Sequence, residues 1–257
     1  MSEPREPIRL EVEVEGTPEE VWRAIATGPG ITSWYVPHVV EEREGGAATA
    51  SFGDAPEMQV PGRVAAWEPP HRIVFDGGAD VGGLAFEWLV EARDGGSCVV
   101  RLVNSGFGEG EEWDDQYDAM VEGWKLFLFN LQLHCRYFLG QAATPMLPMG
   151  ATSLPRSEGW EKLCSELGIP TAPAVGDHVQ VDAGDGLGMS GTVVKATPNA
   201  IALLLDAPAP GTAFVAAEGS DAGGTVSVWS YVYGPDAPSI VERDKARWAE
   251  WLAAFGT

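Results

Sequence analysis

The most informative segment of the chain contains the sequence Gly123-Trp124-Lys125-Leu126-Phe127-Leu128-Phe129-Asn130-Leu131. It predicts a helix over residues 114–139, because apolar side chains recur at intervals of three and four and so fall on one face. The residues of this face are Tyr117, Met120, Trp124, Phe127, Leu131 and Phe138. Such a face needs a concave apolar partner. A curved sheet around one long helix would supply it and would leave a cavity, where ligands usually bind.

The residues before this helix predict a series of short strands. Residues 8–15 alternate between apolar and charged side chains, which is typical of a half-buried antiparallel strand. A helix follows, with Thr17 as N-cap, Pro18 at its first position and Glu20 completing a capping box. Further strands are predicted at 36–42, 47–52, 59–67, 72–76, 84–92 and 97–104, between Gly and Pro breakers. This pattern predicts an α+β fold with an antiparallel sheet, not a doubly wound sheet.

The remainder of the chain partly repeats this pattern. We expect a first domain at 1–140, a linker rich in Pro, Ala and Met at 141–156, and a shortened partial repeat at 157–257 that lacks the opening strand. The repeat has a helix near 157–167 and a last helix at 239–255. That last helix carries Trp248, Leu252 and Phe255 at the spacing of Trp124, Leu128 and Leu131. The alternative is a small SH3-like barrel plus a helix, suggested by Gly176-Asp177-His178-Val179 followed by Gly191-Thr192-Val193-Val194.

Composition excludes several classes of partner. The chain has 16 Lys and Arg against 38 Asp and Glu, a formal net charge of −22, which repels nucleic acids and anionic membrane surfaces. No apolar run approaches the roughly 20 residues that span a membrane, and the N-terminus does not resemble a secretory signal. The three cysteines, Cys98, Cys135 and Cys164, have no metal-binding spacing. They indicate buried, reduced thiols in a cytoplasmic protein.

Four motifs occur in order over residues 8–139. They are Thr17-Pro18-Glu19-Glu20-Val21-Trp22, Ser33-Trp34-Tyr35-Val36-Pro37, Trp67-Glu68-Pro69-Pro70-His71-Arg72-Ile73, and Gly123-Trp124 with Leu128 and Leu131. Together they resemble the activator-of-heat-shock-protein-ATPase homologue branch of the START-like (SRPBCC) superfamily. The resemblance implies a helix-grip fold, in which a curved antiparallel sheet grips its C-terminal helix around a hydrophobic cavity. Members of the superfamily include lipid and hormone carriers, antibiotic-binding proteins, polyketide cyclases and a co-chaperone, so the fold alone implies no particular chemistry.

The candidate ligand-binding residues would line this cavity. They are Trp34 and Tyr35 at its lip, Phe86 and Trp88 on the sheet, and Trp124, Phe127, Leu131 and His134 on the helix. The alternative is that these side chains simply fill the core. If the protein were an enzyme, His134 would be its catalytic proton shuttle; otherwise it is a buried, hydrogen-bonded histidine. His38 and His71 are expected at the surface. The histidines lack metal-ligand spacing, so neither a metal nor another cofactor is expected.

Two further features belong to the long helix. Negative charge is favourable at a helix N-terminus. We therefore expect the acidic residues near its start to stabilise the helix rather than to bind calcium. These residues are Glu109, Glu111, Glu112, Asp114, Asp115 and Asp118. Apolar residues that lie off the inner face predict a contact with the second half of the chain or with a second subunit in a homodimer. These residues are Leu126, Phe129, Leu133 and Tyr137.

Three functions are compatible with these observations. The first is a cytoplasmic binding protein for a hydrophobic, aromatic small molecule, which requires a cavity with few polar groups. The second is an enzyme of the polyketide cyclase or aromatase kind, which requires polar groups such as Tyr117 or Asn104 to converge with His134. The third, implied by the resemblance, is an interaction protein that modulates a chaperone ATPase. We expect a binding protein rather than an enzyme.

Overall fold

The computed structural model describes residues 6–53, 55–77, 84–107, 112–220 and 222–255. The chain divides into two compact units, Met1–Ala142 and Ala143–Thr257, each of which is described by itself. Within the described residues, no helix is both long and apolar enough to cross a membrane.

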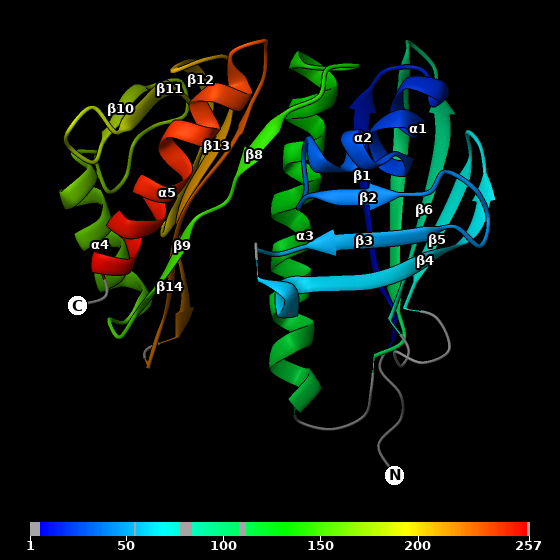
Figure 1. Ribbon diagram of the computed structural model, residues 1–257, viewed down its shortest axis with the longest axis horizontal. Coiled ribbons are helices and arrows are strands. Elements are labelled where there is room, and N and C mark those ends of the chain that lie inside the picture. The colour runs from blue at the N-terminus through cyan, green and yellow to red at the C-terminus, as the bar shows by residue number, and fades with distance from the viewer. Residues whose placement is uncertain (1–5, 54, 78–83, 108–111, 221, 256–257) are drawn as a thin grey trace. The chain divides into compact units, whose positions relative to one another are not determined.

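The first unit is built on a seven-stranded antiparallel sheet (Figure 1). Its strands are β1 (Ile8–Glu15), β2 (His38–Val40), β3 (Ala47–Ser51), β4 (Gln59–Glu68), β5 (Arg72–Asp76), β6 (Ala85–Arg93) and β7 (Ser97–Ser105). The helices are α1 (Pro18–Ala26), α2 (Gly28–Thr32), a short 3-10 helix (Pro56–Met58) and α3 (Glu112–Tyr137). The strand order is β1-β7-β6-β5-β4-β3-β2. The predicted α+β class is confirmed, and the predicted strands match the observed ones to within about two residues at either end.

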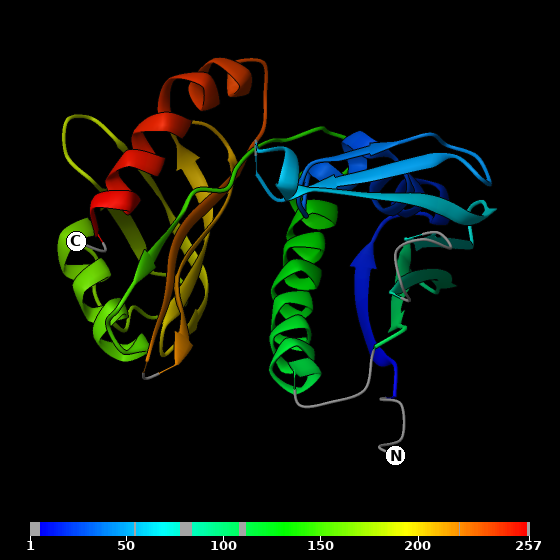
Figure 2. The ribbon, with the colours of Figure 1, turned by 60° about the horizontal axis from the view of Figure 1, so that its bottom comes forward.

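β1 and β7, which are the first and the last strand of this sheet along the chain, are neighbours within it. β1 pairs with β7 so that Val12 lies opposite Val100 and Val14 opposite Cys98, and helix α3 packs against β1 (Figure 2). The inward faces of these strands and of α3 form one hydrophobic core, which includes Val100, Trp124 and Leu131. The sheet therefore curves around α3, as the helix-grip expectation requires.

Helix α1 begins with the predicted capping box. The backbone N–H of Thr17 donates to Glu20 Oε2 at 2.9 Å, and the backbone N–H of Glu20 donates to Thr17 Oγ1 at 3.3 Å. Two backbone donors at the start of the helix are thereby satisfied. Helix α1 buries Val21, Trp22 and Ile25 against the sheet, and the chain continues directly into α2.

Helix α3 begins and ends two residues earlier than the predicted 114–139. Trp124, Leu131 and Phe138 are buried, and Tyr117, Met120 and Phe127 are half-buried, so the predicted face is the inner face. Of the acidic residues predicted at its start, Glu109 and Glu111 lie outside the described residues. The side chains of the others, Glu112, Asp114, Asp115 and Asp118, are likewise not described.

The second unit has its own antiparallel sheet and two helices. Its elements are β8 (Thr144–Met146), β9 (Met149–Thr152), α4 (Arg156–Leu167), β10 (His178–Asp182), β11 (Gly188–Thr197), β12 (Ala200–Ala207), β13 (Gly211–Ser220), β14 (Gly223–Val232) and α5 (Ala237–Phe255). The strand order is β10-β11-β12-β13-β14-β8, and β9 also pairs with β14. Trp248, Leu252 and Phe255 of α5 are buried in the core of this unit.

The linker prediction at 141–156 was wrong, because β8, β9 and the first residue of α4 lie within it. The same two strands correct the expectation that the second unit lacks an opening strand. β8 and β9 both pair with β14, the last strand, just as β1 pairs with β7 in the first unit. In both units the chain runs from the opening strand through a helix and an antiparallel meander to a final helix. This shared element order is what a shortened repeat predicts; the repeat and its alternative, a small SH3-like barrel plus a helix, both stay predictions.

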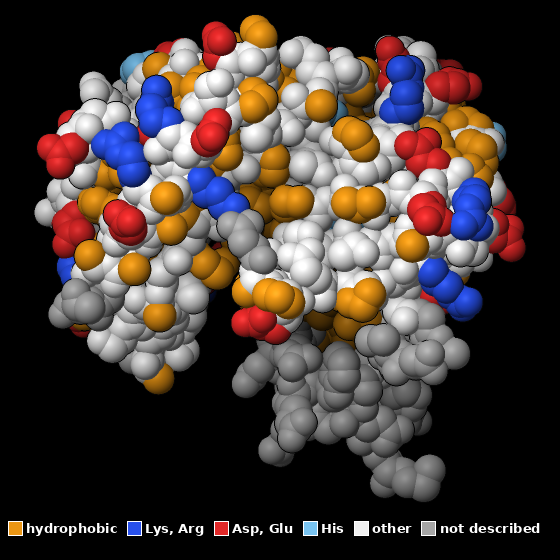
Figure 3. Space-filling view, in the orientation of Figure 1, with side chains coloured by type: hydrophobic (Ala, Val, Ile, Leu, Met, Phe, Trp, Pro, Cys, Tyr) orange, Lys and Arg blue, Asp and Glu red, His pale blue; other side chains and the backbone are white. Residues whose placement is uncertain are grey.

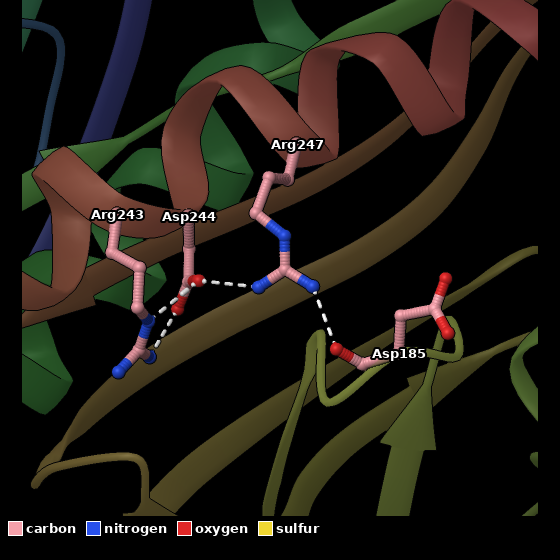
Figure 4. A network of polar contacts seen from close by, with 4 residues as sticks. All are labelled: Asp185, Arg243, Asp244 and Arg247. Carbon is pink, nitrogen blue, oxygen red and sulfur yellow. Dashed lines mark hydrogen bonds and ion pairs between the residues drawn. The ribbon is translucent and has the colours of Figure 1, made fainter.

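A buried carboxylate fixes α5 in the second unit (Figure 4). Asp244 is only 2% exposed. Its carboxylate accepts from Arg243 Nε at 2.8 Å and from Arg247 Nη1 at 3.1 Å. Arg247 also donates from Nη2 to the carbonyl oxygen of Asp185 at 2.8 Å. Because Asp185 lies in the turn between β10 and β11, this network joins the helix to the far end of the sheet.

Candidate functional site

The first unit contains a cavity of about 330 Å³ between its sheet and its helices. Its wall comes from α2 and the segment after it, from strands β2 to β6, and from the first half of α3. Most of the lining side chains are aromatic or aliphatic. The polar exceptions include His38, Arg63 and Asp76. The cavity is therefore a largely apolar container with a few defined polar positions.

Five of the eight predicted site residues line this cavity. They are Trp34, Tyr35, Phe86, Trp88 and Trp124. The sequence brings them together because the strand residues share an inward face and Trp124 lies on the inner stripe of α3.

The other three predicted residues, Phe127, Leu131 and His134, are not part of the cavity lining. Leu131 is fully buried, His134 is 2% exposed, and Phe127 packs its ring 4.5 Å from the ring of Tyr35. Ten residues of helix separate Trp124 from His134, which is a rise of about 15 Å. The cavity lies beside the first half of α3, where Met120 and Trp124 line it, whereas these three residues occupy later turns of the helix. Their role in ligand binding therefore stays a prediction that the cavity lining does not support.

Aromatic rings in mutual contact form one wall of the cavity. Trp88 lies between two tryptophans, with ring centroids 5.5 Å from Trp34 and 5.5 Å from Trp124, both in edge-to-face geometry. Tyr35 lies 5.0 Å from Trp124. Such contacts favour defined ring orientations, so the rings of this wall hold one another in position.

Hydrogen bonds hold Trp34 in this wall. Its indole Nε1 donates to the carbonyl oxygen of Ala24 in α1 at 2.9 Å. Its own carbonyl oxygen accepts from the side-chain amide of Asn130 in α3 at 3.0 Å. Trp34 is 1% exposed and Asn130 is 1% exposed, so both bonds are shielded from water. The wall is thus fixed to two helices.

His38 lines the cavity and is half-buried, so the prediction that it lies at the surface was wrong. Its backbone N–H donates to Thr32 Oγ1 at 2.9 Å, and its ring Nδ1 lies 2.7 Å from the carbonyl oxygen of Val36. Burial lowers the pKa of His38 to about 4, although the bond to Val36 acts in the opposite direction. The imidazole is therefore neutral at pH 7. Sequence periodicity could not identify it, because β2 is only three residues long.

His134 is also neutral at pH 7, since burial lowers its pKa to about 4. It occupies the inner side of α3, as predicted, but outside the cavity lining. Tyr35 lines the cavity, and burial raises the pKa of its phenol, which keeps the hydroxyl protonated.

Arg63 and Asp76 form a paired charge at the exposed edge of the cavity. Arg63 Nε donates to Asp76 Oδ1 at 2.8 Å and Nη2 donates to Oδ2 at 3.2 Å. The two residues lie opposite each other on β4 and β5. The Arg63 side chain is 53% exposed, which places the pair at the rim rather than inside. This hydrogen-bonded carboxylate raises the pKa of Arg63, and the two charges neutralise each other.

Charge elsewhere on the surface is also mixed. Figure 3 shows one face of the molecule, on which Lys and Arg side chains stand among Asp and Glu side chains. Arg101, for example, pairs with Glu11 and Glu91. Within the described residues, no group of three or more His, Cys, Asp or Glu side chains could hold a metal ion.

The apolar residues on the outer side of α3 differ in exposure. Leu133 is buried, Leu126 and Phe129 are half-buried, and Tyr137 is 41% exposed. Their role as an interface stays a prediction, which a measurement of the oligomeric state would test.

Comparisons with known proteins give one family match and several similar solved structures. Residues 15–134 match the model of the Activator of Hsp90 ATPase homolog 1-like protein family. No curated protein sequence matches the chain significantly. Among solved structures, a Bacillus halodurans protein is 20% identical over 51% of this chain and 98% of its own, with a TM-score of 0.45.

Two other solved structures are similar over both units. BexL, a di-domain ARO/CYC from the BE-7585A biosynthetic pathway, is 15% identical over 97% of this chain and 99% of its own, with a TM-score of 0.46. A protein of the dynemicin biosynthetic locus is 18% identical over 98% of this chain and 97% of its own, with a TM-score of 0.44. The family match therefore falls within the first unit and covers most of its curved sheet and of its long helix.

Proposed function

We propose that the first unit binds a small hydrophobic, aromatic molecule in the cavity between its sheet and α3. The observation that carries this proposal is the cavity of about 330 Å³ with a wall of contacting aromatic rings. Ligand pockets in proteins span about 300–1,000 Å³ and are mostly apolar with a few placed polar groups. The volume lies near the lower end of that range, which favours a compact ligand.

The electrostatics of the cavity support an uncharged ligand. Arg63 and Asp76 satisfy each other at the rim. His38 is neutral because burial lowers its pKa to about 4. Burying an unpaired charge is costly, and none of these groups offers an unpaired opposite charge to offset that cost.

The geometry favours binding over acid–base catalysis. An efficient general acid or base has a pKa near the working pH. His134, the histidine that the enzymatic alternative requires, is absent from the cavity lining. His38 does line the cavity, but with a pKa of about 4 it is a weak base at neutral pH. We therefore assign no catalytic residue. The buried free thiols Cys98, Cys135 and Cys164 support a reducing, cytoplasmic location as part of this proposal.

Filling the cavity tests the proposal. Ala50 lines the cavity on β3, whereas Ala47 on the same strand is exposed. Ala50→Phe places a ring in the ligand volume, and Ala47→Phe adds the same ring outside it. We expect the wild type and Ala47→Phe to bind Nile red with similar affinity, and Ala50→Phe to bind at least about tenfold more weakly, a difference of about 1.4 kcal/mol.

Thermal unfolding would establish that each variant is folded. Met120→Trp narrows the cavity from α3 and gives an independent version of the same comparison. Equal binding by the wild type and both filled variants would contradict the proposal, as would a wild-type protein that binds no apolar probe. In that case a function through the outer surface, such as modulation of a chaperone ATPase, would become the better hypothesis.

A further inference from the structure

The imidazole of His38 has a fixed tautomer. Its Nδ1 lies 2.7 Å from the carbonyl oxygen of Val36. A carbonyl oxygen can only accept a hydrogen bond, so Nδ1 carries the proton and donates. Since burial keeps the ring neutral at pH 7, the other nitrogen, Nε2, carries a lone pair and is an acceptor. Among the described residues, no hydrogen bond to Nε2 is present.

The position of this acceptor is fixed by its surroundings. The backbone N–H of His38 donates to Thr32 Oγ1 at 2.9 Å, and the Thr32 hydroxyl in turn donates to the carbonyl oxygen of Gly28 at 2.7 Å. The ring of His38 lies 5.5 Å from the ring of Tyr35. Tyr35 lies 5.0 Å from Trp124, and His38 itself lines the cavity, so its ring lies at one end of an aromatic surface.

The occupant of the cavity determines whether this acceptor is satisfied. A ligand without a donor would take water away from Nε2 and leave its lone pair unpaired, which is unfavourable. A carboxylate has no proton to donate and would also approach a chain with a net charge of −22. A neutral O–H group on an aromatic ring meets both requirements, because its proton satisfies the acceptor and its ring packs against the aromatic wall.

We propose that the cavity selects phenols, with the phenolic hydroxyl donating to His38 Nε2 and the ring packing beside Tyr35 and Trp124. This inference rests on the binding function proposed above and adds to it the class of ligand and the residue that determines specificity.

A matched pair of probes tests the inference. 2-Naphthol and 2-methoxynaphthalene differ by one methyl group, which removes the donor. The readout is the ratio of their two affinities, measured by calorimetric titration at pH 7. We expect the wild type to favour 2-naphthol by roughly three- to tenfold, the range for one net hydrogen bond. His38→Phe removes the acceptor and should lower this ratio by the same factor, to near one, while both probes still bind.

Three controls complete the experiment. His71 is an exposed histidine, so His71→Phe should leave the ratio at its wild-type value. His38→Gln retains an acceptor oxygen and should preserve part of the preference. His38→Leu gives the same comparison as His38→Phe if the larger ring prevents folding. An unchanged ratio in folded His38→Phe or His38→Leu would overturn the role of His38 but leave the binding function intact. Failure of the wild type to bind either probe would instead overturn the binding function and, with it, the inference.

Discussion

The side-chain amide of Asn130 donates a 3.0 Å hydrogen bond to the carbonyl oxygen of Trp34, and both residues are buried. This bond joins the second half of α3 to the aromatic wall of the cavity. Without it, the Trp34 carbonyl would be buried with one fewer partner. We predict that Asn130→Ala lowers the free energy of unfolding by about 1–3 kcal/mol, the cost of leaving a buried polar group unsatisfied. Denaturant titration of the wild type and the variant would measure this difference in the free energy of unfolding.

Lys125→Ala provides the control on the same helix. Lys125 is exposed, and its Nζ pairs with Glu122 at 2.6 Å. Exposed ion pairs contribute about 0–1 kcal/mol, so this variant should remain close to the wild type. Similar losses of stability in both variants would show that the Asn130 bond has no special role.

Gly28 allows α2 to approach the strand that carries His38. A Cβ atom at position 28 would lie 2.8 Å from the carbonyl oxygen of His38, which is closer than real Cβ contacts. We predict that Gly28→Ala displaces the start of β2 and lowers the free energy of unfolding by about 1–3 kcal/mol, as overpacking does elsewhere. It should also weaken the binding of 2-naphthol, which calorimetric titration would measure.

Gly123→Ala is the matched control for this substitution. Gly123 lies within α3, and a Cβ atom there would meet nothing within 4 Å apart from its chain neighbours and the backbone of its own helix. Alanine favours a helix by about 0.8–1 kcal/mol over glycine, so this variant should be slightly more stable than the wild type. If Gly28→Ala were stabilised to the same extent, close packing at Gly28 would be disproved.

The sequence was sufficient to predict the first unit because its signals are strong and local. The alternation in β1, the capping box at Thr17 and the apolar face of α3 each depend on neighbouring residues. In the second unit, local sequence patterns were not sufficient to predict every strand. β8 and β9 have only three and four residues, and Pro145 and Pro148 interrupt any alternation. These strands exist because β14 offers them a partner, which is a long-range effect that no local pattern contains.

The sequence was sufficient to predict part of the candidate site. Periodicity placed Trp88 and Trp124 on inward faces, and both are buried and line the cavity. It could not show how far along α3 the cavity extends, which is why His134 was included although it does not line the cavity. It also could not show that His38 turns inward, because that depends on the approach of α2 to β2.

The three cysteines should be unreactive in the folded protein. All are buried, and burial raises the pKa of Cys135 and of Cys164 to about 12 and also raises the pKa of Cys98. The thiolate is the reactive form, and at pH 8 a thiol with such a pKa is ionised at roughly one part in 10⁴. We predict slow reaction with Ellman's reagent in the native state and rapid reaction of all three thiols in denaturant. Rapid labelling of the native protein would contradict this burial.

Asp244 should make the stability of the second unit depend on pH. Hydrogen bonds from Arg243 and Arg247 lower its pKa below the ordinary value of 3.8, against the opposing effect of burial. Asp244→Asn removes the charge that both arginines pair with, so we predict a loss of about 1.5–3 kcal/mol at pH 7, the range for hydrogen bonds to charged groups. Denaturant titration of the wild type and the variant at several pH values would measure it.

The sign of the pH dependence follows from the direction of the shift. Since the folded state has the lower pKa, the carboxylate stabilises the fold fully above the unfolded-state value of about 3.9. This stabilisation is lost as the pH falls through the folded-state pKa. The difference between the wild type and Asp244→Asn should therefore be constant from pH 7 to pH 5 and should shrink below about pH 4. Glu242→Gln removes the same charge from an exposed position on α5 and should change stability by less than about 0.5 kcal/mol. A difference that grows on acidification would show that the arginines do not stabilise the ionised form of Asp244.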